Sequence, residues 1–382
     1  MARRRESGPG RLRLTWAGTF EPDFNRNRKL SKLLELAGVE VTRIQAPIWG
    51  ANRVELASTG KTISAIRLLG AFPRLLWRLL RAPRPDVYLV SYPGWFDMPL
   101  VWVVARLKRS RVVFDPFISL FDTAVADRAL YSKTSWVGRL VRVVDRVALR
   151  MADVVIADTR EHLLYYDTMA TGATERGQVI PLGADDSVFY PRGHVVPDGR
   201  TVVFHGTFVP LQGAVTVVEA ADLLRDEDVR FLLIGDGQDR RAVEGLMTER
   251  EMTNIELLGL VPLDTVREHI SRASICLGIF GDSDKAARVV PNKVYECVAM
   301  GRPVITRSGP AIDDAFGDED VVRVPPRDAQ ALADAIRALL ADPDHRDALA
   351  AAGRRRYEER FHESVLSRAM ERALRQAVDL GR

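Results

Sequence analysis

Short apolar runs rich in β-branched residues alternate with longer segments of helical periodicity along the whole chain. An uninterrupted apolar run fits a strand buried on both faces, which is typical of parallel sheets covered by crossover helices. A stretch dense in proline and glycine, YPRGHVVPDGR at 190–200, divides the runs into two sets of six. We therefore expect an α/β protein with two doubly wound, Rossmann-like domains. The expected strands are residues 12–17, 39–44, 86–91, 111–115, 153–158 and 178–182, then 201–206, 229–235, 254–259, 274–279, 302–307 and 320–324.

The order of these runs predicts the domain organisation. We assign residues 1–190 to an N-terminal domain, 191–200 to a linker and 201–360 to a C-terminal domain, which suits a chain of 382 residues. A last helical segment, 361–382, is expected to cross back to the N-terminal domain. Residues 1–10 are expected to form a disordered arm, because no apolar stretch of signal-peptide length follows them. Open parallel sheets bind ligands outside the carboxyl ends of their strands, so we expect the site in a central cleft that both domains face.

The composition is that of a globular protein, with 47% apolar and 28% charged residues. No run of about 18 uninterrupted apolar residues occurs, so no membrane-spanning helix is expected. The two cysteines, Cys276 and Cys297, lie in apolar surroundings without metal-ligand spacing, and we expect Cys297 in the core. This cysteine usage favours a reduced, cytoplasmic location.

The net charge of +4 hides an uneven distribution. Residues 1–190 contain 29 Lys and Arg against 19 Asp and Glu, so the remainder is acidic. Surplus arginine typical of a GC-rich genome explains this as well as an anionic partner does. Two basic segments, 62–84 and 133–150, alternate arginine with apolar residues that include tryptophan. They either make peripheral contact with an anionic membrane or pack a doubly wound domain under arginine stems. No nucleic-acid partner is expected, because no reading helix or stacking platform is found.

The stretch RVVPNKVYECVAMGRPVIT at 288–306 predicts a helix followed by a strand. Pro291 suits the first turn of this helix, but the helix dipole disfavours Lys293 there. A bound diphosphate would explain the lysine, and Arg288 and the free N–H groups of the helix start would also meet its charge. Glu296, one turn on, could accept hydrogen bonds from two ribose hydroxyls. A solvated Lys293–Glu296 pair on one helix face explains the spacing equally well.

The segment PNKVYECVAMGRPVIT resembles the donor-binding helix of GT-B glycosyltransferases of family 4. In that family a Glu precedes a run such as A-x-G-x-P-V-I and binds the ribose of a nucleotide sugar. The resemblance extends over nearly the whole chain. HGTFVPLQG (205–213) is similar to the glycine-bearing turn that opens the second domain, and LLIGDGQDR (232–240) and LLGLVP (257–262) to the strand ends that follow. VIPLGADDSVFYP (179–191) is similar to the segment that leads out of the first domain.

The resemblance implies transfer of a sugar, of the hexosyl type, from a nucleotide-sugar donor to a hydroxyl acceptor with retention of anomeric configuration. The acceptor could be a glycan, a lipid-linked glycan or a small molecule, and neither a metal nor another cofactor is expected. Arg288 and Lys293 are expected to be catalytic, because they would balance the charge of the leaving diphosphate. His205 is expected as a hydrogen-bonded wall of the site. The expected donor-binding residues are Gly18, His205, Gly206, Thr207, Gly235, Leu258, Gly259, Val261, Lys285, Arg288, Asn292, Lys293 and Glu296.

Three residues depart from the family pattern. Arg288 stands eight positions before Glu296, where the family often has a glutamate that meets the sugar. Thr207 and Gln212 stand where the second domain's turn usually has an arginine and a lysine for the diphosphate. Phosphate binding is therefore expected to shift to the cations of KAARVVPNK (285–293).

In the N-terminal domain, AGTFEPDFNRNRKL (17–30) joins the first expected strand to its helix. Gly18 would let the backbone approach the diphosphate. Asn25, Arg26 and Arg28 could reach the acceptor, although charges on a helix surface are the commoner use of such residues. Asp115 follows the fourth strand and either positions the acceptor hydroxyl, as a catalytic residue, or caps the next turn.

Other functions are weighed on two further motifs. Asp282-Ser283-Asp284 has the form of a metal-binding D-x-D, but the cations that follow it favour a helix-capping role for Asp282 or Asp284. IGDGQ (234–238) would suit a Rossmann-type NAD-dependent oxidoreductase, yet it lacks the third spaced glycine. A catalytically silent GT-B scaffold that binds a partner is the remaining alternative, because the turn at 205–213 lacks its basic pair.

Overall fold

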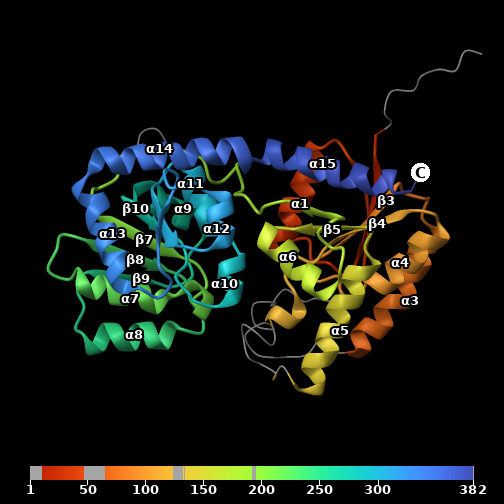
Figure 1. Ribbon diagram of the computed structural model, residues 1–382, viewed down its shortest axis with the longest axis horizontal. Helices are drawn as coiled ribbons and strands as arrows, with labels where there is room; N and C mark the ends of the chain where they lie inside the picture. The colour runs from red at the N-terminus through yellow and green to blue at the C-terminus, as the bar shows by residue number, and fades with distance from the viewer. Residues whose placement is uncertain (1–10, 47–64, 124–131, 133, 192–194, 382) are drawn as a thin grey trace, which may run out of the picture. The chain divides into compact units, whose positions relative to one another are not determined.

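The computed structural model describes residues 11–46, 65–123, 132, 134–191 and 195–381, with 65–69 as backbone only (Figure 1). The expected arm at 1–10 and parts of the expected helix 62–84 and linker 191–200 lie outside these residues. The chain divides into two compact units. The first comprises Met1–Asp158, Leu163–Ile180 and Leu366–Arg382, and the second comprises Thr159–His162 and Pro181–Val365.

Each unit contains one six-stranded sheet whose described strand pairs are all parallel. The prediction of an α/β fold with two doubly wound sheets is therefore confirmed. In the first unit the elements are β1 (Arg13–Gly18), α1 (Asn25–Leu36), β2 (Glu40–Gln45), α3 (Ala65–Arg81), β3 (Val87–Ser91), α4 (Met98–Leu107), β4 (Arg111–Asp115), α5 (Trp136–Met151), β5 (Val154–Ala157), α6 (Arg160–Met169) and β6 (Gly177–Val179).

The second sheet is followed by helices that return the chain to the first unit. Its elements are β7 (Thr201–His205), the 3₁₀ helix η2 (Pro210–Gln212), α7 (Ala214–Leu223), β8 (Arg230–Ile234), α8 (Arg240–Glu249), β9 (Ile255–Leu258), α9 (Leu263–Arg272), β10 (Ile275–Leu277), α10 (Asp284–Arg288), α11 (Asn292–Ala299), β11 (Val304–Arg307), α12 (Pro310–Ala315), β12 (Val322–Val324), α13 (Ala329–Ala341), α14 (Pro343–Arg360) and α15 (Glu363–Asp379). Among the described helices, none combines the length and apolarity needed to cross a bilayer.

The strand orders place β1 and β7 at equivalent points. The first sheet runs β2-β1-β3-β4-β5-β6 and the second runs β12-β11-β10-β7-β8-β9. From β7 the chain builds outward on one side through β8 and β9, and later on the other side through β10 to β12. The carboxyl end of β7, at His205, is therefore a topological switch point, where open parallel sheets bind ligands.

Apolar packing covers both faces of the first sheet. Helices α3, α4 and α5 cover one face, on which Leu75, Val101 and Leu149 are buried in one core cluster (Figure 1). On the other face, α1 and α15 contribute Leu30 and Met370 to a second cluster that includes β1 residues. Helix α15 thus completes the core of the first unit, although it follows the second unit in the sequence.

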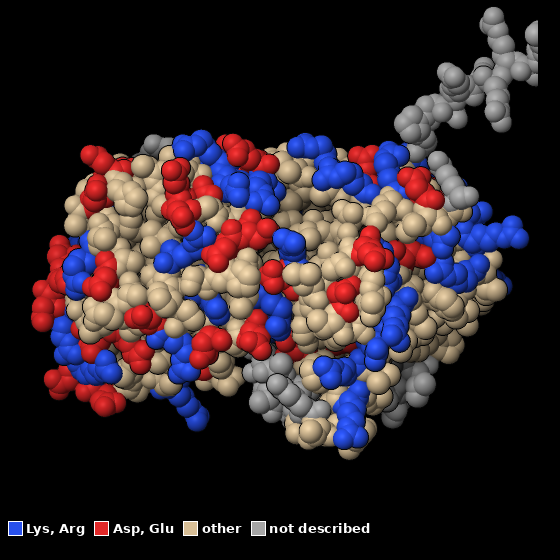
Figure 2. All heavy atoms as spheres, in the orientation of Figure 1, with Lys and Arg blue, Asp and Glu red and all other residues tan. Residues whose placement is uncertain are grey.

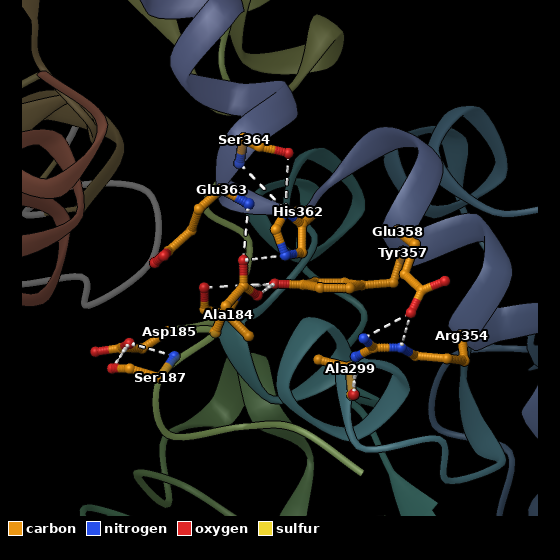
Figure 3. Close-up of polar contacts among 11 residues, drawn as sticks. Ala184, Asp185, Ser187, Ala299, Arg354, Tyr357, Glu358, His362, Glu363 and Ser364 are labelled. Atoms are coloured by element: carbon orange, nitrogen blue, oxygen red, sulfur yellow. Dashed lines mark hydrogen bonds and ion pairs between the residues drawn. The ribbon is translucent and has the colours of Figure 1, made fainter. Parts of the chain in front are cut away.

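The segment 181–190, expected at the end of the N-terminal domain, belongs to the second unit instead. In this segment, the carboxylate of Asp186 accepts hydrogen bonds from the Tyr357 hydroxyl at 2.5 Å and from the Glu363 N–H at 2.8 Å (Figure 3). The Ala184 N–H donates to the same Tyr357 oxygen at 3.1 Å, and His362 Nε2 lies 3.3 Å from Asp186. These contacts fix the segment to the junction of α14 and α15, so the unit boundary lies at Ile180.

Candidate donor-binding site

Glycines at the ends of β7 and β8 allow two loops to meet at the switch point. Gly206 and Gly235 have φ values of 139° and 141°, which L-amino acids with side chains rarely adopt. A Cβ at position 235 would overlap the carbonyl oxygen of Gly206, and one at 206 would lie 2.6 Å from Gln212 Oε1 and 3.1 Å from Lys293 Nζ. Gly206 is therefore required by the close approach of two functional side chains.

After β10 the chain forms two short helices in succession, α10 and α11. Ser283 caps α10, because its Oγ accepts from the Ala286 N–H at 3.1 Å. The expected capping role thus falls to Ser283 rather than to Asp282 or Asp284. The chain is extended at Val289, and Pro291 is the N-cap of α11, one position earlier than expected. Asn292 and Lys293 consequently occupy the first turn of α11, where backbone N–H groups have no helical partner.

The Lys293 amine is buried at the start of α11. Its side chain is 4% exposed, its Nζ donates to Gln212 Oε1 at 2.6 Å, and it lies 3.7 Å from the centroid of the Phe204 ring. Within the described residues, no carboxylate lies within ion-pair distance of this amine. Burial lowers the pKa of Lys293 to about 7, and nearby Cys297 and Glu296 oppose that fall. A buried lysine beside a neutral amide lacks the counter-ion that burial ordinarily requires.

Glu296 projects from the next turn of α11 toward the end of β7. Its Oε2 lies 2.9 Å from His205 Nε2, and the two side chains are 17% and 9% exposed. The expectation that His205 is hydrogen-bonded is confirmed. A solvated Lys293–Glu296 surface pair is excluded, because the two side chains contact Gln212 and His205 instead of each other. Cys297 is buried and free, as expected.

The remaining expected phosphate ligands lie on α10. Lys285 and Arg288 are half-buried on its last turn, separated from α11 by the extended residues at 289–291. The three cations therefore do not share one helix, and Lys293 alone stands at the first turn of α11. Thr207, next to Gly206, is exposed.

Three of the expected donor-binding residues lie at the end of β9 and in the loop that follows it. Leu258 ends that strand, and Gly259 and Val261 are half-buried in the loop beyond it. A Cβ at 259 would lie 3.7 Å from Arg240 Nη1, and the same guanidinium lies 3.5 Å from the carbonyl oxygen of Gly235. Arg240, at the start of α8, thus joins the ends of β8 and β9, a position that its surface-like sequence context did not suggest.

In the first unit, Asp115 and Arg26 form a buried ion pair. Arg26 Nε and Nη2 each lie 2.8 Å from Asp115 Oδ2, and both side chains are 0% exposed. Arg26 Nη1 also donates to the Ile180 carbonyl at 3.0 Å. Burial raises the pKa of Asp115, and the Arg26 guanidinium opposes that rise. Because Arg26 is fully buried in this pair, it does not reach the surface, where an acceptor contact was expected. The carboxylate of Asp115 likewise points to Arg26 rather than to the surface.

Gly18 and the exposed residues of α1 have different surroundings. A Cβ at Gly18 would lie 2.5 Å from Asp97 Oδ2, so its φ of 131° accommodates a side chain of the same unit. Buried Asp97 accepts from the Thr19 N–H at 2.7 Å and the Thr19 hydroxyl at 2.9 Å, and burial raises its pKa to about 6. Asn25 and Arg28 are exposed, and their contact with an acceptor stays a prediction.

No group of three or more His, Cys, Asp or Glu residues that could hold a metal is found in the described parts of the chain. Asp282, of the D-x-D sequence, instead pairs with Arg327 at 3.1 Å.

These observations define the class: a protein of two parallel α/β units, with a buried cation and a His–Glu pair at the switch point of the second sheet. Residues 199–342 match the family model described as "Glycosyl transferases group 1", and residues 24–183 match the "Glycosyl transferase 4-like domain". The chain is 24% identical over 315 residues to the putative colanic acid biosynthesis glycosyl transferase WcaI of Escherichia coli (strain K12), with 74% of each chain covered.

Two solved structures share the fold. A sucrose-phosphate synthase from Thermosynechococcus elongatus has a TM-score of 0.73 and 19% identity, with 96% of this chain and 99% of that chain covered. Anabaena Alr3699/HepE, solved in complex with UDP, has a TM-score of 0.70 and 14% identity, covering 95% of this chain and 99% of its own. The chain belongs to the family 4-like glycosyltransferases of GT-B fold, and it is a glycosyltransferase.

This membership replaces the alternative of an NAD-dependent oxidoreductase. The glycines of IGDGQ serve backbone packing, because a Cβ at Gly237 would lie 2.5 Å from the carbonyl oxygen of Phe208.

Proposed function

We propose that this enzyme transfers a hexosyl group from a nucleoside-diphosphate sugar to a hydroxyl acceptor, with retention of anomeric configuration. The observation that carries the proposal is the buried Lys293 amine, which contacts the neutral Gln212 amide at 2.6 Å and has no carboxylate counter-ion among the described residues. A donor diphosphate would supply that negative charge. Anabaena HepE has been solved with UDP and with UDP-glucose, which supports a donor of this class.

The first turn of α11 suits the leaving group. Its N–H groups and Lys293 would stabilise the diphosphate as the bond from its oxygen to the anomeric carbon breaks. The acceptor oxygen bonds to the same face of that carbon, and its proton passes to the leaving diphosphate. Glu296, held by His205 at 2.9 Å, would present its remaining carboxylate oxygen to the ribose hydroxyls. Charge balance by Lys293 and Arg288 supports a reaction without metal.

Calorimetric titration with UDP, GDP, dTDP, ADP and NAD tests the donor site. We expect one nucleoside diphosphate to bind without added metal and Glu296→Gln to weaken it about tenfold, because the ribose then meets a neutral amide in place of a charge-assisted acceptor. Glu249→Gln, at an exposed position on α8, is the matched control and should bind as the wild type does. Binding of NAD alone would contradict the proposal.

Donor turnover tests catalysis separately from binding. Release of the nucleoside diphosphate from its sugar, with an acceptor present, supports an active transferase. Tight binding of the diphosphate without turnover on any acceptor would favour the silent scaffold that lacks the family's basic pair. The anomeric configuration of the product, measured by NMR coupling constants, tests retention.

A further inference from the structure

Three neighbouring helices of the first unit present a mixed basic and apolar surface. Helix α4 packs between α3 and α5 on one face of the sheet (Figure 1). Their inward residues, such as Leu79, Val104 and Ala148, belong to a single core cluster. We call the outward residues of these helices and of the turns that follow α3 and α4 the basic apolar face. Its exposed members are Arg74, Trp77, Arg78, Leu80, Arg81, Arg84, Val103, Leu107, Arg109, Trp136, Arg139, Leu140, Arg142, Val143, Arg146, Val147 and Arg150.

The apolar side chains of this face are large and well exposed. Trp136 is 75% exposed, Leu107 is 70% exposed and Trp77 is 54% exposed. Single exposed apolar residues are ordinary, but a set spread over three adjacent helices marks an interaction surface. The sheet side of these helices is already packed, so the fold itself does not require outward tryptophans.

The fully exposed charges of the face are all positive. The half-buried Asp86, in the turn after α3, is paired with Arg13 at 3.3 Å. Helices α3 and α4 contain no Asp or Glu, and α5 contains only Asp145. Asp145 is turned inward, where it accepts from the Ser119 hydroxyl at 2.6 Å and the Phe121 N–H at 2.9 Å. Over α5, Lys and Arg side chains lie with few acids among them, whereas acids and bases interleave over α8 and α13 (Figure 2).

The arginines of the second unit show what an ordinary solvated helix does. On α9 Arg272 pairs with Glu268 at 2.8 Å, and on α14 Arg354 pairs with Glu358 at 2.7 Å. Such i,i+4 pairs are typical of water-exposed helices. At the corresponding places, four residues after Arg139, Arg142 and Arg146, the basic apolar face has Val143, Arg146 and Arg150, and no acid. It thus combines apolar insertion with positive charge, which is the chemistry that fits an anionic lipid surface.

A nucleic acid fits this face less well. The Arg81 guanidinium lies 4.3 Å from the Trp77 ring centroid, so an arginine already occupies one face of that ring and limits base stacking. The aliphatic residues Leu107, Leu140 and Val143 offer nothing to bases or phosphates, but they suit acyl chains.

We propose that the basic apolar face docks the first unit on a bilayer that contains anionic lipids. Trp77 and Trp136 insert at the level of the headgroups, and the arginines between them contact lipid phosphates. This surface lies outside the donor site, so the proposal does not depend on the donor that the enzyme uses. The docked enzyme would meet acceptors that are themselves anchored in the membrane.

Vesicle flotation of the full chain tests the proposal. We expect binding to vesicles of equal parts phosphatidylcholine and phosphatidylglycerol, weaker binding at high salt, and little binding to phosphatidylcholine alone. Arg139→Gln/Arg146→Gln should lower the partition coefficient by about fivefold per arginine, and Trp136→Ser/Leu140→Ser should lower it on account of the lost apolar insertion. The matched control, Arg241→Gln/Arg355→Gln, removes the same charge from exposed positions of the second unit and should bind as the wild type does.

Thermal unfolding and nucleotide titration of each variant show whether it is folded. Equal binding to both kinds of vesicle, no binding to either, or an equal loss in the control would overturn the proposal. Binding of single-stranded RNA that the α5 variants abolish, with vesicles left unbound, would also overturn it and assign the face to nucleic acid.

Discussion

A buried cation of the first unit and one of the second differ in whether the protein supplies a counter-ion. Arg26 of the first unit has Asp115 at 2.8 Å, with both side chains fully buried. Lys293 of the second unit, 4% exposed, has the neutral Gln212 amide at 2.6 Å and the Phe204 ring at 3.7 Å, but no carboxylate within ion-pair distance among the described residues. Removing a charge from water is unfavourable unless an opposite charge is supplied. The first unit supplies that opposite charge with Asp115. The second unit supplies no such charge to Lys293, at the switch point of its sheet, among the described residues. A closed pair needs no further partner, whereas the open cation is the one that we propose to meet an anionic ligand.

The largest expected effect concerns the closed pair. Asp115→Ala leaves Arg26 charged and buried without its partner, so we expect the free energy of unfolding to fall by about 3–5 kcal/mol. Arg26→Met/Asp115→Leu should recover most of that loss, because no buried charge remains. Urea unfolding of the two variants decides this. A double variant as unstable as the single one would show that the pair is not the source of the effect.

The next effect concerns the open cation. Lys293→Met should lower donor turnover by about a hundredfold to a thousandfold, because one charge that stabilises the leaving diphosphate is gone. The same change should leave the free energy of unfolding unchanged or raised, since the wild type buries an amine without a counter-ion. Steady-state kinetics and urea unfolding of one preparation measure both. A strongly destabilised variant would contradict the contrast with Arg26.

A third change makes the second site resemble the first. Gln212→Glu places a carboxylate beside Lys293 at nearly constant volume, so the amine gains an internal counter-ion. We expect nucleoside diphosphate binding to weaken at least tenfold, because the new carboxylate repels the ligand and competes for the amine. Calorimetry measures the affinity. Unchanged affinity would mean that the diphosphate lies elsewhere.

The smallest effect is the dependence of ligand binding on pH. Burial lowers the pKa of Lys293 to about 7, and a bound diphosphate would raise it, so binding takes up a proton above that pH. Affinity should be highest below about pH 7 and fall by up to about tenfold per unit above it. Lys293→Arg stays charged and should lose this dependence while it keeps that of the ligand phosphate itself. Calorimetry in buffers of different ionisation enthalpy counts the protons.

The same shift makes a stability prediction of opposite sign. Between about pH 7 and the ordinary lysine range near 10.5, the unfolded chain holds a proton that the folded chain lacks. The contribution of Lys293 to the free energy of unfolding of the free enzyme should therefore rise with pH across that window. The rise should be absent from Lys293→Met. A wild type and a variant with parallel profiles would contradict this.

The contrast between the two cations also shows what the sequence could predict. The strands were predictable, because continuous apolar runs admit few other structures in a chain of this composition. Lys293 drew attention as a cation placed against a helix dipole, and Glu296 through the family resemblance, although a solvated surface pair explained their spacing equally well. Their hydrogen-bond partners could not be predicted, because His205 and Gln212 lie 91 and 81 residues away in the sequence. A local sequence pattern does not indicate contacts between residues so far apart.

For Arg26, the local sequence predicted the wrong environment. Its neighbours in NRNRKL suggest an exposed helix surface, yet it is buried because the first turn of α1 lies over the carboxyl end of the sheet. The carboxylate that makes this tolerable is 89 residues away. Local periodicity separates apolar from polar faces, but it does not indicate which polar residue will have an ion-pair partner.

Helix α15 has a consequence for synthesis on the ribosome. Nearly all of the second unit lies between β6 and the residues of α15, such as Leu366 and Met370, that complete the first unit's core. The second unit can finish folding while the first still exposes the part of its core that α15 covers. The nascent first unit must therefore wait, with the second core cluster still lacking Leu366, Met370 and their α15 neighbours, until α15 has been made. Its aggregation-prone interval is set by translation rate as well as by folding rate.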